Sequence, residues 1–533
     1  MPSPAFDYII IGAGSAGCVL AGRLSEDPDC RVLLLEAGGA PGADCRIPGL
    51  YGRLQDSPCD WGDRTLPQRR LNGRRLYLPQ GRALGGSSML NYMIYIRGHR
   101  GDYDEWAASG AAGWSYEEVL PYFCKSERND RLHDRYHGAD GPLTVSSHRR
   151  NPLVERYLAA GCEIGLPFNN DFNGETQEGC GPLQATLTDG LRCSAADAFL
   201  TPARERPNLS IRTHARATRI LFDDRRAIGV DYIHLGAAQK AYADAEVLLC
   251  AGALRSPQLL MLSGVGAKEA LAAKDLEARC DLPGVGRNLQ DHLHTRVRSA
   301  ITQPIAFAAG SDAEQQAARA QYEADRSGPL ASNFLEAGAF VSLAPGEARP
   351  ALQLFFLSQL APDYPEAGPP ERHGITLTAY INRPLSRGAV TLASADPLDR
   401  PVIEFNALDA PDDLHCAIEG VRWNLRLLYA SAFDDIRGEE IAPGVAHRSD
   451  AELESFVRRT ASTTWHPCGT CRMGDDDMAV VDATLRVRGV ERLRVIDASI
   501  MPRIVGGNTN APVIMIAEKA ADMIRGSNAG AAS

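Results

Sequence analysis

The first forty residues alternate between apolar runs and small residues in a way that predicts a strand, a helix and a second strand. Residues 8–11 and 32–35 are two short, unbroken apolar runs, which is typical of strands buried on both faces of a parallel sheet. Between them lie residues 12–17 with three glycines, followed by small and apolar residues that favour a helix. The second run ends at Glu36. This pattern predicts a βαβ unit at the start of the chain.

The glycines of this unit have the spacing of a dinucleotide-binding turn. Gly12 permits a tight turn, Gly14 lets a pyrophosphate approach the backbone, and Gly17 lets helix and strand pack closely. The N–H groups at the start of the helix then favour phosphate. Glu36 lies 19 residues after Gly17, where a carboxylate can accept hydrogen bonds from a ribose. The alternative is a structural βαβ unit without a ligand.

Apolar periodicity predicts further elements later in the chain. Alternating patterns at residues 209–212, 219–222 and 227–232 indicate a small antiparallel set of hairpin strands. A buried strand at 246–253 returns to the nucleotide fold, with Pro257 at the start of the helix that follows. Three later segments complete the pattern: a helix at 311–326 and strands at 352–357 and 375–381, which would form the wall of a substrate domain.

Composition narrows the class of protein. The chain has 533 residues, of which 44% are hydrophobic and 23% charged, as expected for a large globular protein. Its formal charge of −11 argues against a nucleic-acid-binding surface. Residues 8–22 carry no charge, but they are too short and too rich in glycine to span a membrane. We therefore expect a cytoplasmic protein, with peripheral attachment to the inner face of the cell membrane left open.

Cysteine and histidine positions do not indicate a metal or disulfide site. The thirteen cysteines are scattered through a long chain, which favours reduced thiols, and Cys468-x-x-Cys471 lacks a thioredoxin-like context. His292-x-His294 has no third ligand nearby, so we predict no metal site. His133, His137 and His148 lie in polar segments and are predicted at the surface.

Two late segments contain candidate chemistry. His466, followed by Pro467 on a glycine-bounded loop, is a candidate acid/base, although a single histidine is more often structural. Residues 508–510 read Asn-Thr-Asn before Pro512, and Asn510 is equally compatible with a helix cap. Earlier in the chain, residues 81–91 place two glycines before two serines, a backbone arrangement that suits a second cofactor contact.

Four segments together resemble the signatures of the glucose–methanol–choline (GMC) family of flavin oxidoreductases. They are residues 12–17, 81–91 and 252–266, and the pair His466-Pro467 with 508–510. The resemblance covers nearly the whole chain and is greatest to the choline-dehydrogenase-like and aliphatic alcohol dehydrogenase branch. It implies FAD rather than NAD. The cofactor-binding residues that it implies are Gly12, Gly14, Ser15, Gly17, Glu36, Arg82, Gly85, Gly86, Ser87, Asn91, Ala217, Asp497, Ala498, Thr509 and Pro512.

The resemblance also implies a reaction. A primary alcohol would be oxidised to the aldehyde by hydride transfer to flavin N5, with His466 as acid/base and Asn510 as the second active-site residue. Electrons would pass to a quinone or similar acceptor. Alternatives on the same scaffold are an alcohol oxidase that uses O₂, a lyase of the hydroxynitrile type and a photodecarboxylase. Leu90 stands where some relatives attach FAD through a histidine, so non-covalent FAD is predicted.

The substrate side is less defined. A quaternary-ammonium substrate calls for an aromatic cage with a carboxylate. Glu336 is a candidate for that carboxylate or else an acid outside the pocket, and Trp465 is a candidate pocket residue. The predicted fold is α/β: a Rossmann-type FAD-binding domain interrupted by an α+β substrate domain with an antiparallel sheet. We assign residues 1–155, 195–298 and 462–533 to the first domain and residues 156–194 and 299–461 to the second.

Overall fold

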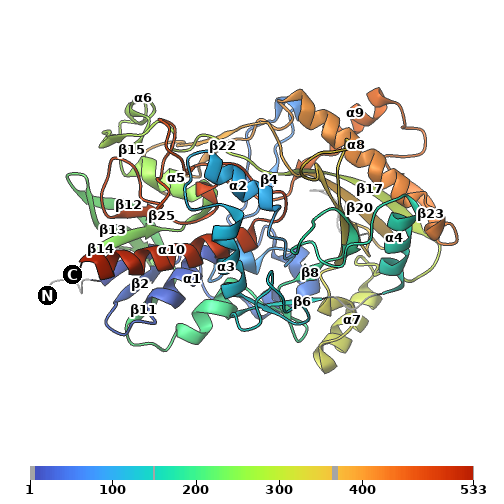
Figure 1. Cartoon of the computed structure of the whole chain (residues 1–533), viewed down its shortest axis with the longest axis horizontal. Coiled ribbons are helices and arrows are strands. Elements are labelled where there is room, and N and C mark those ends of the chain that lie inside the picture. The colour runs from blue at the N-terminus through green and yellow to red at the C-terminus, as the bar shows by residue number, and fades with distance from the viewer. Residues whose placement is uncertain (1–5, 148–150, 363–369, 532–533) are drawn as a thin grey trace.

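Two seven-stranded sheets form the centre of the protein (Figure 1). The computed structural model describes residues 6–147, 151–362 and 370–531. The first sheet contains the chain's first two strands together with its last, and the second is built from strands that lie between residues 179 and 463. The predicted α/β fold with a separate antiparallel sheet is confirmed.

The first sheet is the nucleotide-binding sheet. β1 (Phe6–Ile11) pairs in parallel with β2 (Val32–Leu35) on one side and with the end of β14 (Ala237–Leu249) on the other. β11 (Leu209–Arg212) and β25 (Leu493–Val495) extend it in parallel. β1, β2 and the end of β14 are apolar and almost fully buried, as strands with both faces covered must be.

Two helices beside this sheet come from opposite ends of the chain. α1 (Ser15–Leu24) follows β1 directly, and α10 (Asn510–Ala531) lies along it although almost 500 residues separate them (Figure 1). Arg23 of α1 forms an ion pair with the buried Glu518 of α10, 2.7 Å apart. The N- and C-terminal segments of the described chain thus form one layer beside the cofactor turn.

The predicted antiparallel hairpin is confirmed for two of its three segments. β12 (Ala215–Asp223) and β13 (Arg226–His234) pair antiparallel, and β13 continues the pairing onto the first half of β14. The segment 209–212 was predicted as part of the same hairpin, and this is wrong. It pairs in parallel with β2, because its partner is supplied by the first βαβ unit rather than by the next strand in sequence.

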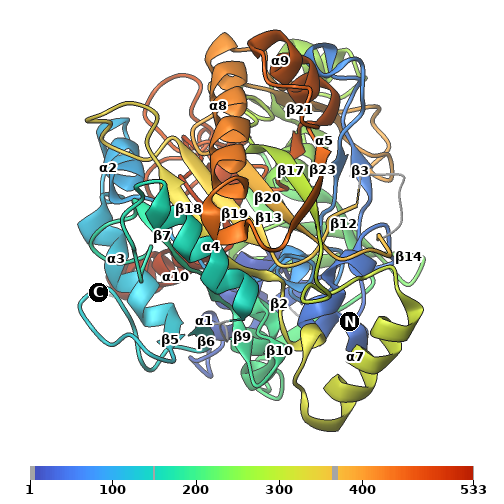
Figure 2. The same ribbon diagram turned by 90° about the vertical axis from the view of Figure 1, so that its right-hand side faces the viewer.

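The second sheet is antiparallel and has two different faces. Its order is β23–β17–β20–β19–β18–β7, and β24 also pairs with β17. One face is apolar and is covered by α4 and α8, with α9 at its end (Figure 2). Its elements are β7 (Gly179–Pro182), β17 (Leu293–Ile301), β18 (Leu335–Val341), β19 (Leu352–Leu357), β20 (Gly374–Ile381), β23 (Arg437–Ala442), β24 (Ser462–Thr463), α4 (Pro152–Glu163), α8 (Pro411–Leu428) and α9 (Asp450–Thr460).

The sheet pairing bears on the proposed domain boundaries without deciding them. β17 runs across the boundary placed after residue 298, and β24 belongs by sequence to the FAD-binding segment that starts at 462, yet both lie in the antiparallel sheet. The two-domain division therefore stays a prediction. Other elements include α2 (Arg100–Ala108), α3 (Tyr116–Ser126), α5 (Gly252–Leu262), α6 (Lys268–Ala272) and α7 (Asp312–Asp325). Within the described ranges, none of the helices is long and apolar enough to cross a membrane.

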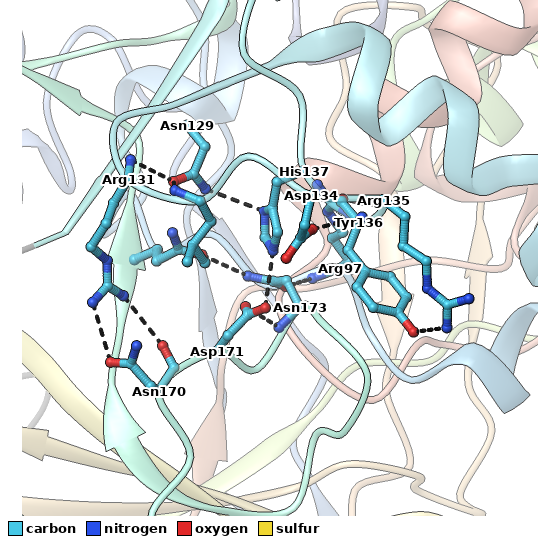
Figure 3. Close-up of polar contacts among 12 residues, drawn as sticks. Arg97, Asn129, Arg131, Asp134, Arg135, Tyr136, His137, Asn170, Asp171 and Asn173 are labelled. Carbon is cyan, nitrogen blue, oxygen red and sulfur yellow. Dashed lines mark hydrogen bonds and ion pairs between the residues drawn. The ribbon is translucent and has the colours of Figure 1, made fainter.

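A buried polar cluster holds the loops beneath α3, and it corrects one prediction. His137 lies between the carboxylates of Glu127 and Asp171, at 3.1 and 3.0 Å, and Figure 3 shows its contact with Asp171. Arg97 forms an ion pair with Glu127 at 2.5 Å. His137 is only 5% exposed, so its predicted surface position is wrong. His133 is exposed as predicted, and His148 lies outside the described residues.

Candidate active site

A large cavity lies between the two sheets and contains most of the predicted site. It offers about 250 Å³ to the centre of a water-sized sphere. One end is bounded by the turn after β1 and by β2, and the other by side chains of β18, β19 and β20. The predicted site residues that line it are Gly12, Gly14, Ser15, Glu36, Gly86, Ser87, Asn91, Ala217, Trp465, His466, Asp497, Ala498, Thr509 and Asn510.

The glycine-rich turn has the shape that its sequence predicts. Gly12 has a φ of +100°, and a Cβ there would lie 2.6 Å from the carbonyl oxygen of Cys250. Gly17 packs so closely that a Cβ would lie 1.9 Å from the carbonyl oxygen of Gly12. Gly14, the N-cap of α1, borders open space instead, and no side chain caps the helix. The N–H groups at the start of α1 are thus available for a phosphate in the cavity.

Glu36 is held at the end of β2 by the same turn. Its carboxylate accepts hydrogen bonds from the N–H groups of Ala13 at 2.9 Å and Gly38 at 2.8 Å. Burial raises the pKa of Glu36 to about 7, while these two N–H groups oppose that rise. The carboxyl group is fixed in position and lines the cavity, as a ribose-binding acid requires.

The segment 81–91 packs against the first turn. A Cβ at Gly86 would lie 2.5 Å from Cα of Gly14, so the two glycine turns meet backbone to backbone. The side-chain oxygen of Asn91 accepts from the guanidinium of buried Arg192 at 2.8 Å, which fixes Asn91 at the cavity wall. Arg82 does not line the cavity; its guanidinium lies 4.8 Å from the centre of the Trp61 ring, which does.

Asp497 connects a late segment of the chain to the start of α5 at the cavity. Its carboxylate accepts from the N–H of Gly252 at 2.9 Å and from the Ser256 hydroxyl at 2.5 Å. Burial raises its pKa, and these hydrogen bonds oppose the rise. Among the remaining predicted cofactor residues, Gly17, Gly85 and Pro512 do not line the cavity; Gly17 and Gly85 shape the two turns that do.

His466 lies at the opposite end of the cavity, on the loop after β24. Its backbone N–H donates to the buried carboxylate of Asp291 at 2.9 Å, which anchors the loop. Its Nδ1 lies 3.0 Å from Nδ1 of His292 and 3.0 Å from the Thr464 hydroxyl. Burial and the neighbouring His292 hold the pKa of His466 well below its usual range, so the ring is neutral at pH 7.

The contacts of His292 assign the tautomer of His466. Burial lowers the pKa of His292 to about 4, so it is also neutral, and its Nε2 faces the carbonyl oxygens of Asn382 and Val505 at 3.1 Å. Carbonyls only accept, so Nε2 carries the proton and Nδ1 of His292 is an acceptor. Nδ1 of His466 must then be the donor. Nε2 of His466 is left unprotonated at the cavity wall.

The residue beside that nitrogen is Asn508, and this corrects the predicted pair. The side-chain amide of Asn508 lies 3.3 Å from Nε2 of His466. The side-chain oxygen of Asn510 accepts from the hydroxyl of Ser15 at 2.7 Å instead. Because α10 begins at Asn510, residues 508 and 510 point to different ends of the cavity. The structure therefore pairs His466 with Asn508, not with Asn510.

The two predicted substrate residues differ in position. Trp465 lines the cavity, with its ring centre 5.5 Å from that of Tyr92. Glu336 does not line it: its carboxylate accepts from the Ser332 hydroxyl at 2.7 Å and from the side chains of Asn151 and Ser358. Burial raises the pKa of Glu336, and these hydrogen bonds oppose the rise. Of the two readings of Glu336, the geometry favours an acid outside the pocket.

Comparison with known proteins places this architecture in a class and then in a family. The fold and cavity are those of dinucleotide-binding oxidoreductases. A family model described as GMC oxidoreductase matches residues 6–294, and a second with the same description matches residues 384–517. The chain belongs to the GMC oxidoreductase family, so it is an enzyme that acts on the CH–OH group of donors, and FAD is its cofactor.

Similar proteins cover almost the whole chain. The "Oxygen-dependent choline dehydrogenase" of Ectopseudomonas mendocina is 46% identical over 98% of this chain and 94% of that protein. The mitochondrial choline dehydrogenase of Mus musculus is 44% identical over 98% and 89%. Among solved structures, pyridoxine 4-oxidase from Mesorbium loti superposes with a TM-score of 0.89 at 34% identity, covering 98% of this chain and 99% of that one. A formate oxidase superposes with a TM-score of 0.93 at 28% identity, covering 99% of each chain.

The residues present fit FAD. The open space beside Gly14 and the N–H groups that begin α1 suit a pyrophosphate, and the fixed carboxylate of Glu36 suits a ribose. Gly252, at the start of α5, also borders open space on the cavity side. These features would hold the pyrophosphate and ribose of FAD at one end of the cavity, and His466 lies at the other end.

Sequence reasoning missed the residues that contact His466, among them His292 and Asn508. His292 was considered only as a metal ligand, and Asn508 only as part of the motif that contains Asn510. Nothing in the local pattern links His292 to His466, since 174 residues separate them. Asn508 lies only two residues before Asn510, and nothing in the local sequence distinguishes the two asparagines as partners of His466.

Proposed function

We propose that the protein oxidises a primary alcohol to the aldehyde at this cavity, with His466 as the base. The observation that carries the proposal is the unprotonated Nε2 of His466, which faces the cavity while its other nitrogen is engaged by His292. Alcohol oxidation requires the O–H proton to leave as the α-carbon gives up hydride, so a fixed neutral imidazole is the group that the chemistry needs. FAD, when bound, supplies the hydride acceptor.

The residues around His466 have separate roles in this proposal. Nε2 of His466 accepts the hydroxyl proton, and the Asn508 amide donates to the oxygen on which negative charge develops. His292 and Thr464 hold the ring by Nδ1, and Asp291 holds the loop by the backbone. Because these contacts fix the His466 ring, the ring needs no reorganisation during proton transfer.

The electron acceptor and the attachment of FAD are part of the proposal. Electrons leave to a quinone or similar acceptor, with O₂ as the second candidate because curated relatives are named oxygen-dependent. Leu90 lines the cavity and offers no nucleophile, which supports non-covalent FAD. Acid precipitation should therefore release the flavin into the supernatant; a yellow pellet would contradict this part.

Anaerobic bleaching of the flavin tests the reaction. Purified holoenzyme is mixed with a panel of aliphatic, benzylic and quaternary-ammonium alcohols, and the visible flavin band is followed. We expect at least one alcohol to bleach it, and His466→Ala to slow bleaching by about 10²–10⁴-fold while FAD stays bound. Exposed His133→Ala is the matched control. Undiminished bleaching by His466→Ala would overturn the assignment of the base; admitting air to reduced enzyme then separates O₂ from quinone as acceptor.

A further inference from the structure

The end of the cavity around His466, called here the substrate end, is lined by rings. Tyr92, Phe355, Tyr380 and Trp465 contribute their side chains to it together with His466. Tyr92 and Trp465 have ring centres 5.5 Å apart, and Phe355 and Tyr380 meet edge to face at 4.8 Å. Such walls accommodate an apolar body, and their faces attract a cation as well. The rings alone therefore do not decide the charge of the substrate.

The carboxylates near the cavity are committed to other partners. Among the described residues, those that line it are Glu36 and Asp497, and both bind backbone N–H groups of the nucleotide-binding sheet and its helices. Asp291 is buried beneath the His466 loop and accepts from Thr463, Thr464 and the His466 N–H. Within the described chain, the substrate end offers no carboxylate to pair with a positive substrate.

A cation lies behind this end instead. Arg296 of β17 is two residues from His294, whose ring centre is 5.6 Å from that of Tyr380, and it pairs with Thr378 of β20. Residues two apart on a strand share a face, so the Arg296 side chain lies on the cavity side of the sheet. Burial raises the pKa of Tyr51, Tyr92 and Tyr380, and the positive charge of Arg296 opposes the rise in each.

The charge of Arg296 is not neutralised by a described carboxylate. Its guanidinium donates to the carbonyl oxygen of Pro362 at 3.4 Å, and no described ion pair includes it. His294, two residues before Arg296 on the same face of β17, is buried with its pKa held well below the usual range, so it is neutral and does not offset the charge of Arg296. Among the described residues, the substrate end is thus bordered by a partly exposed positive charge that no carboxylate offsets.

We propose that the enzyme selects uncharged primary alcohols over quaternary-ammonium alcohols, and that Arg296 is a specificity-determining residue that acts through its charge. The inference rests on the proposed function and names its substrate class. A quaternary ammonium carries its charge into a cavity without a compensating carboxylate and toward a like charge, whereas an uncharged alcohol of the same shape gains the same ring contacts at no electrostatic cost. The choline named for the curated relatives is therefore a poor substrate here.

Two alcohols of the same shape test this selection. Choline and 3,3-dimethylbutan-1-ol differ in one atom, N⁺ against C, and so in charge alone. Anaerobic flavin reduction is measured with each on the holoenzyme. We expect kcat/KM for the uncharged alcohol to exceed that for choline by about tenfold or more, because choline would carry its charge into a buried cavity whose described lining offers that charge no free carboxylate. Equal or faster reduction by choline would overturn the proposal while leaving the alcohol reaction intact.

A substitution tests the effect of the Arg296 charge on selectivity separately from that of the aromatic rings. Arg296→Gln keeps a donor for the Pro362 carbonyl and removes the charge. We therefore expect kcat/KM for choline to rise at least threefold while kcat/KM for the uncharged alcohol stays the same. Arg372→Gln, an exposed arginine beside β20 that pairs with Glu439, is the control and should leave the ratio unchanged. An unchanged ratio in Arg296→Gln would refute the role of Arg296.

Failure of the proposed alcohol oxidation can be distinguished from failure of the proposed selectivity. If no alcohol of the full panel bleaches the flavin, the proposed function is wrong, and selection is then measured by the shift of the flavin absorbance band on titration with choline and with 3,3-dimethylbutan-1-ol. Weaker binding of choline still supports the selective pocket, whereas tighter binding of choline refutes it.

Discussion

The side-chain amide of Asn508 lies 3.3 Å from Nε2 of His466, while Asn510, two residues later, is bonded to Ser15 at the start of α1. One asparagine thus faces the reacting end of the cavity and the other faces the cofactor turn. The two asparagines are close in sequence but contact different parts of the cavity, so experiments can distinguish their roles.

Alanine substitution of each asparagine should give different defects. Asn508→Ala removes a donor beside the developing alkoxide, so flavin reduction should slow by about 10²–10³-fold with FAD retained. Asn510→Ala removes the partner of the Ser15 hydroxyl at the phosphate-binding turn, so FAD should bind more weakly while the reduction rate of the loaded enzyme stays near normal. Stopped-flow reduction and FAD titration check the two results. The reverse assignment of defects would restore Asn510 as the partner of His466.

His292 should act on the reaction through the tautomer of His466. His292→Phe leaves the Thr464 hydroxyl as the remaining acceptor for Nδ1 of His466, so the productive tautomer is less strongly favoured and reduction should slow by about 10–10²-fold. His292→Gln retains an oxygen acceptor and an N–H donor and should recover much of that loss. Equal losses in the two variants would indicate a packing role only, because both change the size of the side chain.

The pH dependence of flavin reduction should reflect the depressed pKa of His466. A histidine whose folded pKa lies below the usual value of about 6.5 is already unprotonated at neutral pH, so the base is present throughout the range above that value. We expect the reduction rate to be level from about pH 6.5 to 9 and to fall only in more acidic buffer. A rate that climbs through pH 7–8 would show that His466 titrates there and is less buried than described.

The sequence predicted the nucleotide end of the site better than the reacting end. Gly12, Gly14 and Gly17 are local: their roles follow from one turn between one strand and one helix, and the structure has that turn. The helix at 311–326 and the strand at 352–357 were also placed within a residue or two, because apolar periodicity and capping are local signals. Partners that come from distant segments leave no such signal.

Pro257 illustrates why the rest could not be predicted. It was expected at a helix start, but α5 begins five residues earlier, at Gly252, where the N–H is bound by the carboxylate of Asp497 from the far end of the chain. A proline inside a helix leaves the carbonyl four residues before it without a partner. Here the hydroxyl of Thr470 donates to that carbonyl, on Ala253, at 2.6 Å. Both compensations are tertiary and invisible in the local sequence.

The His137 cluster should make stability depend on pH above neutrality (Figure 3). Burial alone would lower the pKa of His137, but its hydrogen bonds with Asp171 and Glu127 raise it to about 9. A histidine whose folded pKa exceeds its unfolded value of about 6.5 contributes stability that is fully present below 6.5 and is lost as pH rises through about 9.

His137→Gln should therefore lower the free energy of unfolding by about 3–5 kcal/mol at pH 6, because the buried carboxylate of Glu127 and the partly buried one of Asp171 lose the cation that they share. The difference between wild type and variant should shrink when urea unfolding of the holoenzyme is repeated at pH 10, where the wild-type ring is neutral as well. Exposed His133→Gln, four residues away, should change stability by no more than about 0.5 kcal/mol at either pH. A His137→Gln deficit that is the same at pH 6 and pH 10 would mean that the ring is held by shape and hydrogen bonding rather than by charge.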